Sequence, residues 1–216
     1  MNPVSEYLRF SVESRRALKI KVPEDFQYTC IEDYVYRHGR LMKSAALTEE
    51  ELEIVMEAVR RAESQGFVRE IKQCFSNAQL IVLHDDSDEL IYHEGYAMGR
   101  VGIPVHHAWF TINGKVVDLT WKLKLVEEDV KEAMSGSGVL GSDVKEHPVG
   151  KLPKGYYYVG VPIENRDYLR FRICCREMVG SLLDDWEAGF PLLRGIDPHD
   201  DESVGELVEQ VKARTG

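Results

Sequence analysis

The sequence predicts an α+β domain in which helices pack on an antiparallel sheet. Apolar residues recur at helical spacing over residues 49–64 and 68–83. Three runs rich in aromatic and β-branched residues follow at 90–98, 105–112 and 115–121, and such runs are typical of strands. Strands joined by short turns pair antiparallel, so this order of segments indicates helices packed on one antiparallel sheet.

A chain of 216 residues is long enough for one large domain with its own core. We divide it into an N-terminal extension (1–47), a core that carries the candidate site (48–134), a surface excursion (135–155) and a C-terminal strand with helices (156–216). The excursion is rich in Gly, Ser and Pro, which favour turns. Within the extension, the run YTCIEDYVY fits a strand or a helix on its pattern alone.

The first two predicted helices have recognisable ends. Thr48 and, three residues later, Glu51 form a capping box, and Gly66 supplies a stop. The next helix carries Cys74 and ends at the polar run HDDSD. We therefore expect Cys74 to lie on a helix that precedes the strands.

The same signals predict the later elements. Residues 126–134 have a helical pattern, and residues 156–163 have a strand pattern. Helices are expected over 166–185 and 201–213, separated by a loop that contains Gly and Pro.

The dipeptide Asn113-Gly114 is the strongest hairpin signal in the chain. A two-residue turn of type I′ needs positive φ at both central positions, which Asn and Gly accept. Such a turn pairs Ile112 with Lys115, and the other pairs of the hairpin follow from that register. The turn thus predicts which side chains share a face of the sheet.

Side chains alternate between the two faces of this hairpin. One face is apolar enough to be core and consists of Ala108, Phe110, Ile112, Val117, Leu119 and Trp121. The other consists of His107, Trp109, Thr111, Val116, Asp118 and Thr120. On this second face His107 and Asp118 are diagonal neighbours, close enough for a hydrogen bond. We expect the Asp118 carboxylate to orient the His107 imidazole.

An imidazole held by a carboxylate suits a cysteine nucleophile, because the thiolate is the reactive form of that side chain. Cys74 is the candidate. In the first turn of a helix, the aligned backbone dipoles would lower the pKa of its thiol, and backbone N–H groups would be placed to bind an oxyanion. The sequence leaves open whether the helix begins near Lys72 or near Val68.

Three stretches carry a family resemblance: KQCFSNA at 72–78, EGYAMG at 94–99 and IPVHHAWFTINGKVVDLTW at 103–121. They resemble the transglutaminase-like branch of the papain-type cysteine enzymes, including small bacterial and phage-encoded members similar to the leader-peptide peptidases of lasso-peptide pathways. The resemblance implies a papain-like core in which a helix-borne cysteine is followed by a His strand and an Asp strand. It covers residues 72–121.

The resemblance implies a role for each matching residue. Cys74 would be the nucleophile, His107 the general base and acid, and Asp118 the orienting carboxylate. Gln73 matches the residue before the nucleophile in many transglutaminases, but a papain-type oxyanion Gln lies further upstream, where this chain has residues 68–70, so the oxyanion hole stays unassigned.

Two further residues are cleft candidates. Glu94 would line the cleft if its strand lies beside that of His107, and Trp109 would pack over the site. The implied activity is acyl transfer through a thioester on Cys74, with hydrolysis of an amide or peptide bond as the first expectation. Members of the family also act as peptidases, amidases, deamidases and transglutaminases, so the substrate stays open among a protein, a peptide and a small amide. No cofactor is implied.

Charge and composition restrict the partners. The formal net charge of -10 argues against a nucleic-acid backbone as ligand, because Lys and Arg clusters supply that affinity. No stretch is apolar for the roughly 18 residues that a membrane span needs, and the N-terminus lacks the order of a secretion signal. We expect a cytoplasmic protein. Cys30, Cys174 and Cys175 have no His-bearing motif around them and are expected to be structural free thiols.

Two alternatives stay open. One is a catalytically inactive relative that uses the same fold to bind a host protein or nucleotide, as a phage-encoded protein would. The other is a zinc hydrolase built from His93, Glu94, His106 and His107 with the nearby HDD run. Adjacent strand residues point to opposite faces, which counts against convergence on one ion.

Overall fold

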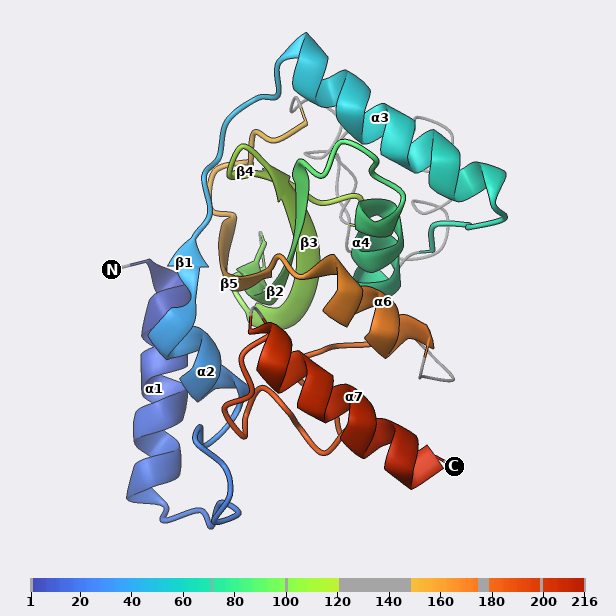
Figure 1. The fold of residues 1–216 in the computed structure, drawn as a ribbon. Helices are drawn as coiled ribbons and strands as arrows, with labels where there is room; N and C mark the ends of the chain where they lie inside the picture. Colours follow the sequence, from blue (N-terminus) through green and yellow to red (C-terminus); the bar gives the residue numbers. More distant parts are fainter. Residues whose placement is uncertain are drawn as a thin grey trace.

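The protein is described by a computed structural model that covers residues 2–70, 72–99, 101–120, 149–174, 179–198 and 200–215. The described chain has the α+β architecture that the sequence predicts, with helices around one curled antiparallel sheet (Figure 1). The elements are α1 (Pro3–Ala17), α2 (Ile31–His38), β1 (Arg40–Leu41), α3 (Glu49–Ser64), α4 (Cys74–Leu83), β2 (Leu90–Met98), β3 (Pro104–Ile112), β4 (Lys115–Val117), β5 (Tyr157–Ile163), α6 (Arg166–Cys174) and α7 (Asp201–Thr215).

The sheet has the strand order β1-β5-β2-β3-β4, and every neighbouring pair is antiparallel. The long strands β2 and β5 form its centre, and β3 pairs with β2 over its whole length. Helices α1 and α2 lie toward the β1–β5 end of the sheet and α3 and α4 toward β3 and β4 (Figure 1), and buried residues of all four join one core. The site-bearing strand β3 is therefore held between β2 and the short strand β4.

The predicted hairpin turn is confirmed. Asn113 has φ 50° and Gly114 has φ 72°, the positive values that a type I′ turn requires. Ile112 pairs with Lys115, and the remaining pairs keep the same register. The partition of faces follows, since the apolar side chains of β3 and β4 join the main core while Trp109 belongs to a smaller cluster on the opposite face.

The strand predicted over 115–121 is shorter than expected, because β4 ends at Val117. Three residues after Val117, the Thr120 N–H donates to Asp118 Oδ1 at 2.9 Å, so a side chain replaces the acceptor that a neighbouring strand would supply. Trp121 lies outside the described residues.

The predicted helix over 49–64 is confirmed at both ends, including the capping box of Thr48 and Glu51. The helix predicted over 68–83 is instead α4 and begins at Cys74. Lys72 has φ 70°, a left-handed conformation that helical backbone does not allow. The Asn77 side chain also holds the backbone of Glu70 through its amide, with bonds of 2.8 and 3.2 Å, so the chain before Cys74 forms a loop.

The strand predicted over 156–163 is confirmed as β5, and the helix predicted over 201–213 as α7. The prediction of a helix over 166–185 was wrong in its second half, where residues 179–185 form a loop with no helix. The carboxylate of Asp185 returns to the buried guanidinium of Arg172, with bonds of 2.6 and 2.8 Å. This buried ion pair needs the chain to reverse, which a continuous helix would prevent.

Other predicted segments are placed as follows. The helix predicted over 126–134 and residues 135–148 of the surface excursion lie outside the described residues, as does Cys175. The N-terminal extension supplies α1, α2 and the edge strand β1, which pairs with β5. The run that fitted a strand or a helix is helical from Ile31 onward, where it enters α2. None of the helices in the described part of the chain is both long and apolar enough to cross a membrane.

Glu51 ties α3 to the hairpin as well as capping the helix. Its carboxylate accepts from the Thr48 backbone at 2.7 Å, from the Asn113 side chain at 3.0 Å and from Lys115 at 2.5 Å. The hydrogen bond from Lys115 is the main reason that the pKa of Glu51 is lowered from 4.5 to about 2. One carboxylate thus holds a helix start and the turn that sets the register.

We expect Glu51→Ala to lower the free energy of unfolding by about 2 kcal/mol at pH 7, because charge-assisted hydrogen bonds are lost. The folded-state pKa is depressed, so this contribution is present above about pH 4.5 and is lost as the pH falls toward 2. Urea unfolding at pH 7 and pH 3 measures both effects. Glu50→Ala removes an exposed carboxylate from the same helical turn and is the matched control. Equal losses of unfolding free energy in the two variants would contradict the role of Glu51 in joining α3 to the hairpin.

Candidate functional site

The hairpin brings His107 and Asp118 into direct contact. His107 Nε2 lies 2.6 Å from Asp118 Oδ2, and the residues are only 3% and 1% exposed. A carboxylate buried this deeply is stable only with hydrogen-bond donors around it. The pair is therefore a shielded, strongly coupled ion pair rather than a surface contact.

Donors from the described residues of β5 and of the adjoining loop also hold the Asp118 carboxylate. The Tyr158 hydroxyl on β5 donates to Oδ2 at 2.8 Å, and the Thr120 N–H donates to Oδ1. Each donor stabilises the ionised form and fixes the plane of the carboxylate. Asp118 is thus positioned by its own loop and by β5, which lies three places from β4 in the sheet.

The charge of Asp118 acts on His107. Burial alone would lower the pKa of the imidazole, but the Asp118 carboxylate, its hydrogen bond and a hydrogen bond with Cys74 raise it to about 10. His107 is therefore an imidazolium at neutral pH. Because Asp118 occupies Nε2, Nδ1 is the nitrogen available to Cys74.

Cys74 is the first residue of α4, with Gln73 as the N-cap. This resolves the question that the sequence left open, since the helix begins near Lys72. The thiol lies at the positive end of the helix dipole, and the first backbone N–H groups of α4 have no intrahelical acceptor. Cys74 is 7% exposed, so the thiol is buried rather than open to solvent.

Asn77 connects the cysteine helix to the His-Asp hairpin. Its amide donates to Thr120 Oγ1 at 3.0 Å while also holding the backbone of Glu70. Thr120 in turn donates its N–H to Asp118. A continuous chain of hydrogen bonds therefore runs from the loop before Cys74 to the carboxylate behind His107.

Aromatic rings enclose the imidazole. Trp109 stacks near His107 at 6.3 Å between ring centroids, and Tyr158 packs edge-on against Trp109 at 5.0 Å. The indole nitrogen of Trp109 has no hydrogen-bond partner among the described residues. Trp109 thus packs beside the His-Asp pair and limits its contact with water.

Glu94 lies elsewhere. Its strand β2 does lie beside β3, but Glu94 pairs with Ala108 whereas Gly95 pairs with His107, so its side chain points to the opposite face. The fully buried carboxylate accepts from Ser181, Leu182 and Leu183 at 2.6 to 3.0 Å. Glu94 anchors this distant segment and takes no part in the His107 contacts.

Gln73 is exposed at the N-cap, where its side chain makes no capping hydrogen bond.

The side chains of the zinc alternative do not converge on one point, although His106 Nε2 lies 3.8 Å from Glu94 Oε2. His93 bonds Thr111 on one face of β2, and burial lowers its pKa to about 3. His106 lies on the other face against Phe75 and Tyr96. Among the described residues no group of three or more His, Cys, Asp or Glu side chains is arranged to hold a metal ion.

Sequence reasoning missed Tyr158 and Asn77. Tyr158 is the last of three consecutive tyrosines, which carry no signal of a polar role, and Asn77 lies on a helix whose apolar spacing indicated only packing. Thr120 carried a signal, because an Asp followed two residues later by a free N–H favours an Asx turn.

We expect Tyr158→Phe to lower the free energy of unfolding by about 1–2 kcal/mol, because Asp118 loses a buried donor. Urea unfolding at pH 7 measures the loss. Tyr157→Phe removes the neighbouring hydroxyl on the same strand and is the matched control, with an expected change below about 0.5 kcal/mol. A loss in the control as large as that in Tyr158→Phe would show that the Asp118 bond contributes little.

The raised pKa of His107 predicts a pH-dependent stability. The folded-state pKa lies above 6.5, so the contribution is complete below about pH 6.5 and disappears as the pH rises through about 10. Imidazole nitrogen shifts measured by NMR report the charge directly. We expect His107 to remain an imidazolium at pH 8 and His93 to be neutral at pH 5. A neutral His107 at pH 7 would contradict the ion pair.

Comparison of the chain with protein-family models, with curated proteins and with solved structures finds no match.

Proposed function

We propose that this chain is a cysteine-dependent acyl-transfer enzyme that hydrolyses an amide or peptide bond through a thioester on Cys74. The observation that carries the proposal is the position of His107 between the Asp118 carboxylate and the Cys74 thiol, with Cys74 at the start of α4. An imidazolium next to a thiol at a helix N-terminus favours the thiolate. This geometry supports a nucleophile activated by a base that a third group orients.

The reaction uses groups that the site already contains. The Cys74 thiolate attacks the carbonyl carbon, and the electrons of the C=O bond move to the oxygen. The N–H groups of the first turn of α4, which have no intrahelical acceptor, would donate to this oxyanion. His107 gives its proton to the leaving amine as the C–N bond breaks, which leaves a thioester and a neutral imidazole. His107 then removes a proton from water, and attack by that water releases the acid and the thiolate.

We also propose that the fold contains a papain-like core. The order along the chain of a helix-borne Cys, a His strand and an Asp segment agrees with a papain-like core of the transglutaminase-like branch. Hydrolysis is preferred to amine transfer because water is the acceptor that needs no second binding site. The acidic net charge of the chain supports a protein, peptide or small amide substrate rather than a nucleic acid.

Alkylation compares Cys74 with an internal control. Cys30 is also 7% exposed and also stands at the start of a helix, α2, but burial raises its pKa. We expect iodoacetamide at pH 6 to modify Cys74 at least about tenfold faster than Cys30, because His107 lies beside the Cys74 thiol whereas burial raises the pKa of the Cys30 thiol. Peptide mass spectrometry measures both rates. His107→Ala should remove the difference, and equal rates in the unaltered protein would contradict thiolate activation.

Covalent trapping tests the catalysis itself. The protein is incubated with esters of short peptides, which are activated acyl donors. We expect an acyl adduct on Cys74 in the unaltered protein and its complete absence in Cys74→Ser. The serine hydroxyl is a much weaker nucleophile at neutral pH, so the variant retains the shape of the site without its chemistry. Release of product at an unchanged rate by Cys74→Ser would overturn the mechanism. Fast alkylation without any acyl adduct would favour the inactive binding protein.

A further inference from the structure

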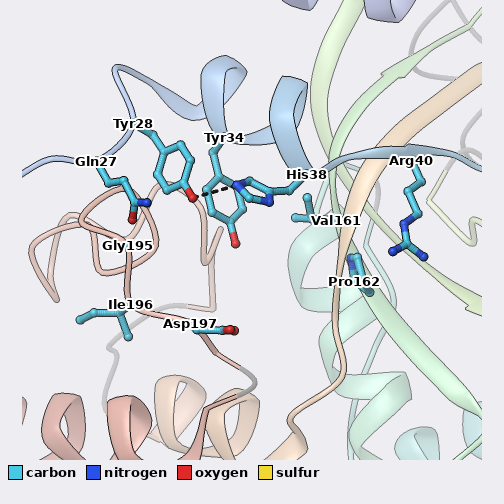
Figure 2. Close-up of a pocket in the computed structure, with 10 residues that line it drawn as sticks. All are labelled: Gln27, Tyr28, Tyr34, His38, Arg40, Val161, Pro162, Gly195, Ile196 and Asp197. Atoms are coloured by element: carbon cyan, nitrogen blue, oxygen red, sulfur yellow. Dashed lines mark hydrogen bonds between the residues drawn. The ribbon is translucent and has the colours of Figure 1, made fainter.

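A second pocket lies apart from the Cys74 site. It has a volume of about 360 Å³ and opens between α2, the end of β5 and the segment 195–197 (Figure 2). This volume falls at the lower end of the range of small-molecule sites, which combine apolar walls with a few fixed polar groups. The lining residues that carry the argument are Tyr28, Tyr34, His38, Arg40, Pro162 and Ile196.

One wall of the pocket is built from two segments remote in sequence. The backbone N–H groups of Gln27 and Tyr28 both donate to the carbonyl of Leu193, at 2.9 and 3.1 Å. Gly195 turns the chain there with φ 89° and lies against the Gln27 side chain. These contacts join the two segments directly, so the pocket is preformed.

Three rings fix the aromatic side. Tyr28, Tyr34 and His38 pack against one another with centroid distances of 4.8 to 5.2 Å. His38 Nε2 lies 2.8 Å from the Tyr28 hydroxyl, which locks two of the rings together. The Tyr34 hydroxyl points into the open space of the pocket in Figure 2. Burial, followed by the charges of Tyr28 and Asp197, raises the pKa of Tyr34 to about 12, so this hydroxyl remains a donor.

Arg40 supplies the one fixed positive charge among the described residues that line the pocket. Its side chain extends from the edge strand β1 beside Pro162 (Figure 2). Within the described ranges its guanidinium forms no ion pair with a carboxylate, so it is available to an anion. A guanidinium binds a carboxylate through two parallel hydrogen bonds.

Asp197 also borders the pocket, across from Arg40 (Figure 2). It already has an interaction partner within the protein, so no group of a ligand is assigned to it. Arg40 therefore sets the charge of the ligand, and one guanidinium matches one carboxylate. The Tyr34 hydroxyl is a second donor, which also favours a ligand with acceptor oxygens over an amine.

The rest of the lining suits an aromatic ring. Val161, Pro162 and Ile196 are apolar walls, and the Tyr34 ring lies on the α2 side of the same space (Figure 2). An aromatic ring packs well on aliphatic side chains, and its contact with a second ring adds to the gain from buried area. Three of the walls can therefore hold one flat apolar body.

We propose that this pocket binds a small aromatic monocarboxylate. Its carboxylate would lie on the Arg40 guanidinium, and its ring would pack between Tyr34, Pro162 and Ile196. The volume suits a single ring with a short acid chain rather than a peptide. The proposal does not depend on the chemistry at Cys74.

Isothermal titration of the full chain tests the carboxylate. Benzoate, phenylacetate and 3-phenylpropanoate carry the same two groups at increasing separation, and we expect at least one of them to bind at millimolar concentration. The amide of the acid that binds best keeps its shape without the charge and should bind at least about tenfold more weakly. Equal affinity of the amide would overturn the carboxylate contact. No binding of any of the three acids would overturn the proposal.

Two further probes test the ring. The cyclohexyl analogue of the same acid keeps the charge without the aromatic ring and should bind about two- to tenfold more weakly. Equal affinity of this analogue would overturn the ring contact. Inorganic phosphate at equal concentration should not displace the acid. Displacement would show a site for anions in general and would overturn the aromatic ligand.

Variants locate the binding. Arg40→Gln should weaken binding of the acid about ten- to a hundredfold and make the acid and its amide bind alike. Tyr34→Phe keeps the ring and removes only the hydroxyl, and a smaller loss is expected. Arg60→Gln removes an exposed arginine on α3 and is the matched control, with no change expected. Unchanged binding by Arg40→Gln would place the acid elsewhere and overturn the proposal. Thermal unfolding of each variant shows whether it has folded.

Discussion

The register of the β3–β4 hairpin is the constraint on which the candidate site depends. A turn of two residues, with positive φ at both, fixes the pairing of every position that follows, and a slip by one residue would move His107 to the other face of the sheet. His107 then meets Asp118 at the point where β4 ends. Glu51 bonds the turn and its flanking lysine, so the helix α3 supports the same register.

Buried carboxylates organise the rest of the described chain. Asp118 holds His107, Glu94 holds the segment 181–183, Asp185 holds Arg172 and Asp33 holds Arg37. Each is at least nine-tenths buried, and each accepts several hydrogen bonds, as burial of a charge requires. Removal of one partner would leave a buried group uncompensated. The contacts of Glu94 join segments that are distant in sequence, those of Asp118 and Asp185 join residues 11 and 13 positions apart, and Asp33 and Arg37 lie one turn apart on α2.

The Cys74 site and the pocket beside α2 use the sheet in different ways. The Cys74 site forms where β4 ends and α4 begins. Its polar groups therefore come from the ends of secondary-structure elements, where backbone N–H groups have no partner within the element. The pocket beside α2 forms at the opposite edge of the sheet, where the short edge strand β1 exposes Arg40. β5 contributes to both, with Tyr158 at Asp118 and Pro162 at the pocket wall.

The sequence by itself determined the local features: the capping box at Thr48, the strands at 90–98 and 105–112, the turn, and through the turn the shared face of His107 and Asp118. These depend on periodicity and on turn chemistry within a few residues of one another. Only the tertiary structure decided that α4 begins at Cys74, that Tyr158 and Asn77 complete the network, and that Glu94 binds residues 181–183. The physical reason is that such hydrogen bonds join residues many positions apart, and no local pattern encodes which distant donor satisfies a buried carboxylate.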